Sequence, residues 1–394
     1  MSFTTYITKI GSSGSGDDQF ETPMGVTILG SYLYVVDRVN HRVVKRALTD
    51  LSYSAQFSFS GQANNSYTIT NDGTYYYIGS QFGPTNIQKR NLSDGVIVVQ
   101  LGDFGLGNDL FNVPMPCTTD GTNLYMCDQG NHRIIKRLLS NLSYVTEIGT
   151  LGDGDDQFYF PTGMCNDGTH LYIADRGNGR IKKHLMSDLS YVSKIGGSDI
   201  SDGVDQMYNV NDITHDGTYL YVLTEGNSFD NTMLLKRNIS DLSHVDRELE
   251  SGSGDDQLSS SFGLSVDCDG AHLYISDTGN DRLMKREIIV VSPPDPPVAS
   301  IQGGIFENTI SWASVVGATS YNIYWDTSSP VTVVPPLYLE KITGVTSPYD
   351  HTELAGGTTI YYIVTAVGDS ESEPSNEVSA TPLLPSNTLG RIIW

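Results

Sequence analysis

A Lys-Arg pair recurs along the first three quarters of the chain at intervals of 44 to 54 residues, and this repeat constrains the fold more than any other feature. A β-rich pattern with a period in that range is typical of a propeller or a solenoid array. The sequence therefore predicts a large all-β array. The pairs begin at Lys45, Lys89, Lys136, Lys236 and Lys285, with a Lys-Lys variant at Lys182.

Each repeat divides into four strand candidates, which in the first copy are residues 25–28, 33–36, 42–46 and 53–57. Small residues suit the first strand to a crowded inner channel, and the apolar second strand is fit for burial. The more polar third and fourth strands are expected outside, with one row of side chains in water. Six radial four-stranded sheets make a closed ring. The second-strand motif occurs at Leu33-Tyr34-Val35, Tyr76-Tyr77-Ile78, Leu124-Tyr125-Met126, Leu171-Tyr172-Ile173, Leu220-Tyr221-Val222 and Leu273-Tyr274-Ile275.

The first residues of the chain resemble a fourth strand. Residues 6–11 match 144–149 and 191–196, which are fourth-strand segments. After Lys285-Arg286, in contrast, the chain runs towards Pro293-Pro294 without a fourth strand of its own. We expect the N-terminal strand to complete the sixth blade, so that the ring has no open edge.

The repeat resembles a known family. Its Gly-Asp-Asp-Gln-Phe, Pro-x-Gly, Leu-Tyr-Val-x-Asp and Gly-Asn-His-Arg-Ile elements are similar to the NHL repeat, whose domains are six-bladed propellers. The resemblance covers residues 1–291 and implies the fold. It implies little about function, because the family spans enzymes, scaffolds and RNA binders.

The Asp-x-Gly-Asn-x-Arg element predicts a tight turn between the second and third strands. Glycine and asparagine are expected to accept positive φ there, and the arginine to bind the aspartate. The repeated tyrosines are expected to pack between blades, with a stacking platform for a base or a sugar as the alternative. The expected structural pairs are Asp37 with Arg42, Asp128 with Arg133, Asp175 with Arg180 and Asp277 with Arg282.

Composition changes at a proline-rich linker over residues 292–297. Alternating strands with one core tryptophan, Trp312, and a tyrosine-rich strand at 359–367 indicate a β-sandwich over residues 298–384. This segment resembles a fibronectin type III domain. The tail, residues 385–394, is predicted to dock, because exposed apolar ends are usually avoided. Docking of Ile392, Ile393 and Trp394 on the chain's own sandwich and on a partner both remain open.

The chain is strongly acidic, with a formal net charge of −23. A phosphate backbone would be repelled over most of such a surface, so no nucleic-acid partner is expected. The four cysteines have no metal-knuckle spacing and are expected to be small buried residues without disulfides. No run approaches membrane-spanning length and no secretory leader is recognisable, so neither membrane insertion nor general secretion is expected.

Catalytic and metal-binding patterns are weak. The eight histidines do not converge on inner-strand positions, and there is no nucleophile elbow or phosphate loop. The Asp pairs at 17–18, 155–156 and 255–256 lack the alternating oxygen donors of a calcium loop, so solvated turns are favoured over calcium binding. We therefore expect no enzyme activity, no cofactor and no metal, with a lyase-type enzyme of this propeller family as the alternative.

Two corners break the repeat, and such departures are where specificity is expected. Residues 80–86 replace the second turn, and residues 225–233 lengthen the fifth. Both loops are expected on the same rim, with repeat decay as the competing explanation. The candidate binding residues are Phe82, Asn86, Asn227, Phe229 and Asp230.

A propeller joined to a fibronectin-like sandwich favours a structural or binding protein. The preferred interpretation is a virion appendage or receptor-binding component of a tailed bacteriophage, because virion proteins need no signal peptide. Its partners would be other virion or surface proteins and a host-surface glycan or protein. The alternative is a microbial surface or extracellular module that binds carbohydrate or protein.

Overall fold

The computed structural model describes residues 3–59, 66–80, 87–197, 207–225, 232–248, 250–259, 263–289, 294–333, 340–368 and 371–385. The chain forms two compact units, Met1–Ile289 and Val290–Trp394. The sequence predicted that the first domain ends at residue 291 and that a linker covers residues 292–297. Both bounds stay predictions. Among the described residues, no helix is both long and apolar enough to span a membrane.

Within the described part of residues 1–289, the strands form six four-stranded sheets. In five of them the four strands follow one another in chain order. These are β2 (Pro23–Leu29), β3 (Tyr32–Asp37), β4 (Arg42–Ala47) and β5 (Tyr53–Ser58); β6 (Ser66–Asn71), β7 (Tyr75–Ser80), β8 (Ile87–Asn91) and β9 (Ile97–Leu101); β12 (Pro114–Thr119), β13 (Asn123–Asp128), β14 (Arg133–Leu138) and β15 (Tyr144–Ile148); β16 (Pro161–Asn166), β17 (His170–Asp175), β18 (Arg180–Leu185) and β19 (Tyr191–Gly196); and β20 (Val210–His215), β21 (Tyr219–Glu225), β22 (Thr232–Asn238) and β23 (His244–Glu248).

The remaining sheet brings the two ends of this unit together. Its order is β1 (Thr4–Ile10), β28 (Arg282–Ile288), β27 (His272–Asp277) and β26 (Ser265–Cys268). Strand β1 pairs antiparallel with β28, from Thr4 opposite Ile288 to Ile10 opposite Leu283. The predicted pairing of the N-terminal strand with the last repeat is therefore confirmed.

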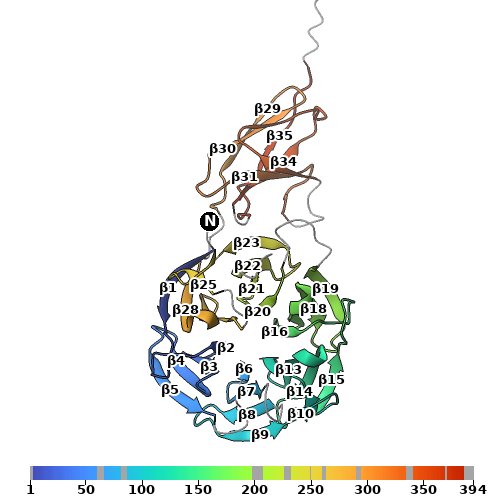
Figure 1. The fold of residues 1–394 in the computed structure, drawn as a ribbon. Helices are drawn as coiled ribbons and strands as arrows, with labels where there is room; N and C mark the ends of the chain where they lie inside the picture. Colours follow the sequence, from blue (N-terminus) through green and yellow to red (C-terminus); the bar gives the residue numbers. More distant parts are fainter. Residues whose placement is uncertain are drawn as a thin grey trace, which may run out of the picture. The chain divides into compact units, whose positions relative to one another are not determined.

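The first unit is a β-propeller (Figure 1). The innermost strands β2, β6, β12, β16, β20 and β26 each contact the next, and β26 contacts β2 again. Short elements lie in the connections: β10 (Asp103–Phe104), β11 (Leu110–Phe111), β24 (Glu250–Ser251), β25 (Gln257–Leu258), η1 (Gln129–Asn131), η2 (Arg176–Asn178) and η3 (Thr278–Asn280).

The third strand of each sheet is more buried than the sequence predicted. We expected one row of its side chains in water, yet Arg46 and Arg137 are fully buried. Their guanidinium groups donate to the carbonyl oxygens of Leu51 at 2.5 Å and Leu142 at 2.6 Å, in the turn after the strand. The turn carbonyls satisfy one terminal nitrogen of each guanidinium group, which lowers the cost of burying it. The fourth strand of the first sheet, β5, alternates as predicted, whereas β15 and β23 alternate only in part.

Several lysines of the pairs join neighbouring sheets, and in the fourth repeat Lys183 does so in place of Lys182. Lys89 Nζ donates to the Leu139 carbonyl at 2.7 Å, and Lys136 Nζ to the Met186 carbonyl at 2.9 Å. The repeated tyrosines lie beneath these lysines: Tyr125 is fully buried and donates to the same Met186 carbonyl at 3.2 Å. The predicted packing of the tyrosines between blades is confirmed.

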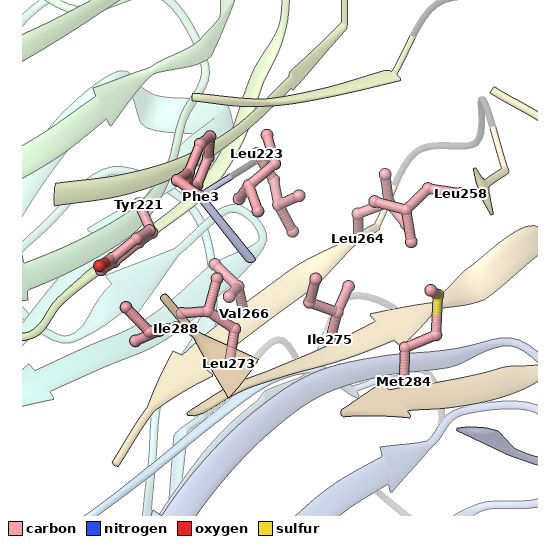
Figure 2. Close-up of a cluster of buried hydrophobic side chains, with 11 residues drawn as sticks. Phe3, Tyr221, Leu223, Leu258, Leu264, Val266, Leu273, Ile275, Met284 and Ile288 are labelled. Atoms are coloured by element: carbon pink, nitrogen blue, oxygen red, sulfur yellow. The ribbon is translucent and has the colours of Figure 1, made fainter. Parts of the chain in front are cut away.

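The core lies between the sheets rather than at one centre. Figure 2 shows one such cluster, in which Phe3, from the N-terminal segment, lies beside Tyr221 and Leu223 of the neighbouring sheet. Leu273, Ile275 and other residues of the last sheet complete it. Each such layer buries apolar surface only because both sheets are present.

The second unit contains two packed sheets. Their strands are β29 (Ala299–Gly303), β30 (Asn308–Trp312) and β33 (Tyr349–His351) in one sheet, and β32 (Glu340–Val345), β31 (Ser320–Asp326), β34 (Ile360–Val367) and β35 (Val378–Ala380) in the other. Trp312, Ile323 and Tyr362 are buried in one shared cluster. Trp312 is thus a core tryptophan as predicted. The tail residues 386–394 lie outside the described residues.

Candidate functional site

One rim of the propeller is built from the corners between second and third strands. At the corner of the fourth repeat, Asp175 is fully buried and accepts a bond from Arg180 Nε at 2.6 Å. The equivalent pairs form at 2.7 Å for Asp37 with Arg42, 2.8 Å for Asp128 with Arg133 and 2.7 Å for Asp277 with Arg282. All four predicted pairs are confirmed.

Each corner also holds the loop that enters its sheet. Asn178 Nδ2 donates to Asp175 Oδ2 at 2.9 Å and to the Gly152 carbonyl at 2.8 Å. Tyr159 N donates to Asp175 Oδ1 at 2.7 Å. Corner and entry loop are therefore one rigid structure, which positions whatever side chains the loop carries.

The corner glycines have a different role from the one predicted. Positive φ falls on the residue after the asparagine, for example His132 at 58° and Gly179 at 59°, and not on the glycine or the asparagine. Gly177 is required for space, because a Cβ atom there would lie 2.7 Å from the Tyr159 carbonyl oxygen. The prediction of positive φ at glycine and asparagine was wrong.

The acidic pairs of the entry loops contact cations of the protein itself. Arg46 Nη1 lies 3.1 Å from Asp18 Oδ1, and Lys9 Nζ lies 2.5 Å from Asp255 Oδ1. Lys194 Nζ lies 3.3 Å from Asp155 Oδ1. Protein cations thus supply positive charge to these turns. Among the described residues, no group of three or more His, Cys, Asp or Glu could hold a metal ion.

The predicted site residues cannot be placed. Phe82, Asn86, Asn227, Phe229 and Asp230 lie outside the described residues, and so do Ile392, Ile393 and Trp394. The structure therefore neither brings them together nor separates them, and these assignments stay predictions.

The entry loop of the third repeat exposes apolar side chains that the sequence analysis missed. Asn131 donates to the Gly105 carbonyl, and Asn40 donates to the Gly14 carbonyl in the same way, so Gly105 is equivalent to Gly14. This equivalence aligns Phe104, Leu106 and Leu110 with polar residues of the first repeat. Phe104 is 67% and Leu106 76% exposed. The residues replaced are Ser13, Ser15 and Gln19.

An aromatic group lies beside this loop, on the next entry loop. By the same alignment, Tyr159 and Phe160 stand where the first repeat has Glu21 and Thr22. Both are exposed, and their ring centroids lie 4.8 Å apart. His132 belongs to the third corner, and its ring centroid lies 4.7 Å from that of Phe160. Its Nδ1 accepts a hydrogen bond from Phe160 N at 3.1 Å. Partial burial lowers the pKa of His132, which favours this neutral acceptor form.

We call Phe104, Leu106, Leu110, Tyr159 and Phe160 the rim platform. The corner 128–133 connects its two parts, because this corner bonds the 103–111 loop and carries His132. Phe160 has a φ of 52°, a strained conformation for a bulky residue. The equivalent residues Thr22 and Val113 each have a φ of 59°, so this conformation belongs to the repeat and is not special to the platform. A comparison of the entry loops, Ser-Gly-Ser-Gly-Asp-Asp-Gln against Phe-Gly-Leu-Gly-Asn-Asp-Leu, was the signal available in the sequence.

The central channel holds a polar cavity of about 290 Å³. Its wall is made by the inner strands, and two of the lining residues, Asp212 and Asp267, are half-buried carboxylates. Asp212 Oδ2 accepts from Val266 N at 3.0 Å, and Asp267 Oδ2 accepts from Ile28 N at 2.8 Å. Each carboxylate therefore links its own inner strand to the next one.

Two cysteines also line the channel, and all four are free thiols. Cys127 and Cys165 are buried as predicted, whereas Cys117 and Cys268 are only half-buried. Burial raises the pKa of Cys268 to about 12, so this thiol stays protonated and unreactive at neutral pH.

The channel carboxylates predict a pH dependence of stability. Burial raises the pKa of Asp267 to about 6, above its ordinary value of 3.8. A raised folded-state pKa means that the folded chain binds the proton more tightly, so stability from this group is gained as pH falls from 7 to 4. Relative to Asp267→Asn, the native chain should gain roughly 2 kcal/mol over that range, measured by urea unfolding at several pH values.

Asp50 provides the control, because its contribution to stability should change with pH in the opposite direction. Hydrogen bonds from Ser52 lower the pKa of exposed Asp50, so relative to Asp50→Asn the native chain should lose stability as pH falls. A difference between native chain and Asp267→Asn that does not change with pH would contradict the assignment.

Comparison with known proteins gives a fold likeness alone. No protein-family model and no curated protein sequence matches the chain. Among solved structures, the β-propeller domain of Cps50 (Swd1) from Myceliophteria thermophila has a TM-score of 0.49 and 14% identity, covering 73% of this chain and 100% of that one. The description of the first unit as a propeller rests on its own sheet order and inner-strand contacts.

Proposed function

We propose that this chain is a non-enzymatic binding protein: a six-bladed NHL-type propeller that presents a binding rim, carried by a fibronectin type III-like sandwich. The observation that carries the proposal is the rim platform, where exposed apolar side chains occupy positions that are polar in the first repeat. The fold does not need them there, because the first repeat builds the same corner with Ser13, Ser15 and Thr22.

The platform has the physical properties of a recognition surface. Aromatic residues such as tyrosine are enriched among the few residues that supply most of the binding energy at protein interfaces, and aromatic rings lose little conformational entropy on binding. Tyr159 is fixed on both sides of its backbone, through its N–H to Asp175 and through its carbonyl from Gly177 N at 2.7 Å. A pre-organised surface binds more tightly, since less ordering is needed.

The proposed setting is a virion surface. Fibronectin-type sandwiches commonly act as spacers on the virions of tailed bacteriophages and on cell surfaces. In this account the sandwich or its tail joins the particle, and the propeller faces outward towards a host-surface glycan or protein. The acidic charge of −23 suits a partner that is not a polyanion.

Two alternatives remain distinct from this proposal. A microbial surface or extracellular module would use the same rim and would differ in location. A lyase-type enzyme would require turnover and a metal retained after dialysis, and metal-free protein with intact binding would exclude it.

Restoring the polar residues of the first repeat tests the rim directly. Phe104→Ser with Leu106→Ser, and Tyr159→Glu with Phe160→Thr, should each weaken adsorption to the host envelope fraction about 30-fold, as expected for hot-spot residues. Melting should stay within a few degrees, because these side chains are exposed. Val98→Thr, an exposed apolar position on β9, is the control and should bind normally. Full adsorption by both double variants would overturn the proposed role of the rim.

A further inference from the structure

The second unit exposes four large apolar side chains at one end. We call Ile305, Phe306, Leu383 and Leu384 the end patch, and their exposed fractions are 57%, 41%, 57% and 64%. They come from two segments that lie side by side, because Ile305 and Leu383 form a parallel β-bridge. An exposed apolar group of this kind on a small domain usually marks a contact surface.

The backbone holds the end patch rigidly. Leu383 N donates to the Gly304 carbonyl at 2.7 Å, and Phe306 N donates to the Leu383 carbonyl at 3.1 Å. Leu354 N in turn donates to the Phe306 carbonyl at 2.9 Å. Phe306 has a φ of 56°, so its exposed ring is held in a strained conformation by these bonds.

The chain leaves this patch with an apolar segment. Residues 386–394 begin immediately after Pro385 and contain Leu389, Ile392, Ile393 and Trp394. These nine residues span at most about 32 Å when extended, and the segment starts beside the patch, so a reversal of the chain can return its apolar side chains to the patch. The segment's one cation, Arg391, is matched by Glu307 and Glu353, which neighbour Phe306 and Leu354 in sequence.

We propose that residues 386–394 fold back over the end patch of their own chain. Both surfaces are apolar, and covering one with the other removes both from water. A short tether gives the segment an effective concentration in the millimolar range, well above that of a free partner or a second copy in dilute solution. The charge of Arg391 favours the same arrangement. The inference rests on the second unit alone and is independent of the proposed role of the rim.

Tryptophan fluorescence reports on this unit selectively. The chain has three tryptophans, Trp312, Trp325 and Trp394, and the propeller has none. Subtracting the spectrum of Trp394→Phe from that of the full chain isolates the emission of Trp394. We expect this emission to be blue-shifted and poorly quenched by acrylamide at every protein concentration. Phe306→Ser, and separately Leu384→Ser, should shift it to that of a water-exposed indole.

The remaining emission serves as a folding control. Trp312 is buried in the sandwich, so an unchanged spectrum of the other two tryptophans shows that each patch variant is folded. Removal of residues 386–394 should lower the Tm of the second unit by about 5 °C. A water-exposed Trp394 in the full chain would overturn the proposal. Shielding only at concentrations where the chain dimerises, or only on purified particles, would overturn it in favour of a second copy or a partner.

Discussion

Deletion of residues 1–11 should abolish the cooperative unfolding transition of the propeller. The segment forms β1, which supplies the outer strand of the last sheet, and it brings Phe3 into the cluster shown in Figure 2. Its loss exposes the edge of β28 and opens a cavity between two sheets. A large buried aromatic group alone contributes about 3–5 kcal/mol, a large share of the stability of a typical domain.

Polar contacts also hold the N-terminal segment in its position. Glu248, from the neighbouring sheet, accepts bonds from Phe3 N at 3.1 Å and Thr4 N at 3.3 Å. Arg286 Nε donates to Thr4 Oγ1 at 2.6 Å. Deletion would leave Arg286 and Glu248 with fewer partners in a buried site, which adds to the loss of apolar burial.

The experiment is thermal unfolding of the full chain followed by circular dichroism. Deletion of residues 1–2 is the matched control, because it leaves β1 complete, and should melt like the native chain. A chain lacking residues 1–11 that keeps the native melting profile would contradict the closure of the ring by β1.

Asp175→Ala should destabilise the propeller by about 3–5 kcal/mol. Asp175 is fully buried and accepts bonds from Arg180, Asn178 and the Tyr159 N–H. Its removal leaves a buried guanidinium group without its carboxylate, which is far more costly than losing an exposed ion pair. Urea unfolding measures the change.

A second aspartate of the same repeat provides the control. Asp153 lies in the entry loop with an exposed side chain, so Asp153→Ala should change the free energy of unfolding by no more than about 0.5 kcal/mol. Equal effects of Asp153→Ala and Asp175→Ala would show that the corner pair is not a major source of stability.

Features that follow from local repetition could be predicted from the sequence. The Asp and Arg of each corner are five residues apart on paired strands, so their contact follows from register. The closing strand could be predicted because residues 6–11 repeat the fourth-strand pattern while the last repeat lacks one.

Features that depend on three-dimensional crowding could not be predicted. Polarity suggested that one row of third-strand side chains lies in water, whereas turn carbonyls such as that of Leu51 bond Arg46 in the interior. The corner glycine suggested positive φ, whereas Gly177 is small because Tyr159 lies against it. Both neighbours lie in the same repeat as the residue they contact, but polarity and turn propensity alone do not show these contacts.

The rim platform shows a different limit. Attention to corners with insertions led to Phe82 and Phe229, while Phe104 and Leu106 stand in a loop of unchanged length. The register of hydrogen bonds, such as Asn131 to the Gly105 carbonyl, confirms the alignment that a direct comparison of the two loop sequences would have given. Substitution at constant length is therefore as informative as insertion in a repeat protein.

Particle association tests the central claim most directly. Native source material would be separated on a density gradient, and mass spectrometry would locate this chain among the fractions. A virion appendage should band with particles of virion size and should stay with them after washing in salt. Recovery of the chain only in the soluble fraction, with no particle-bound portion, would contradict the proposed role.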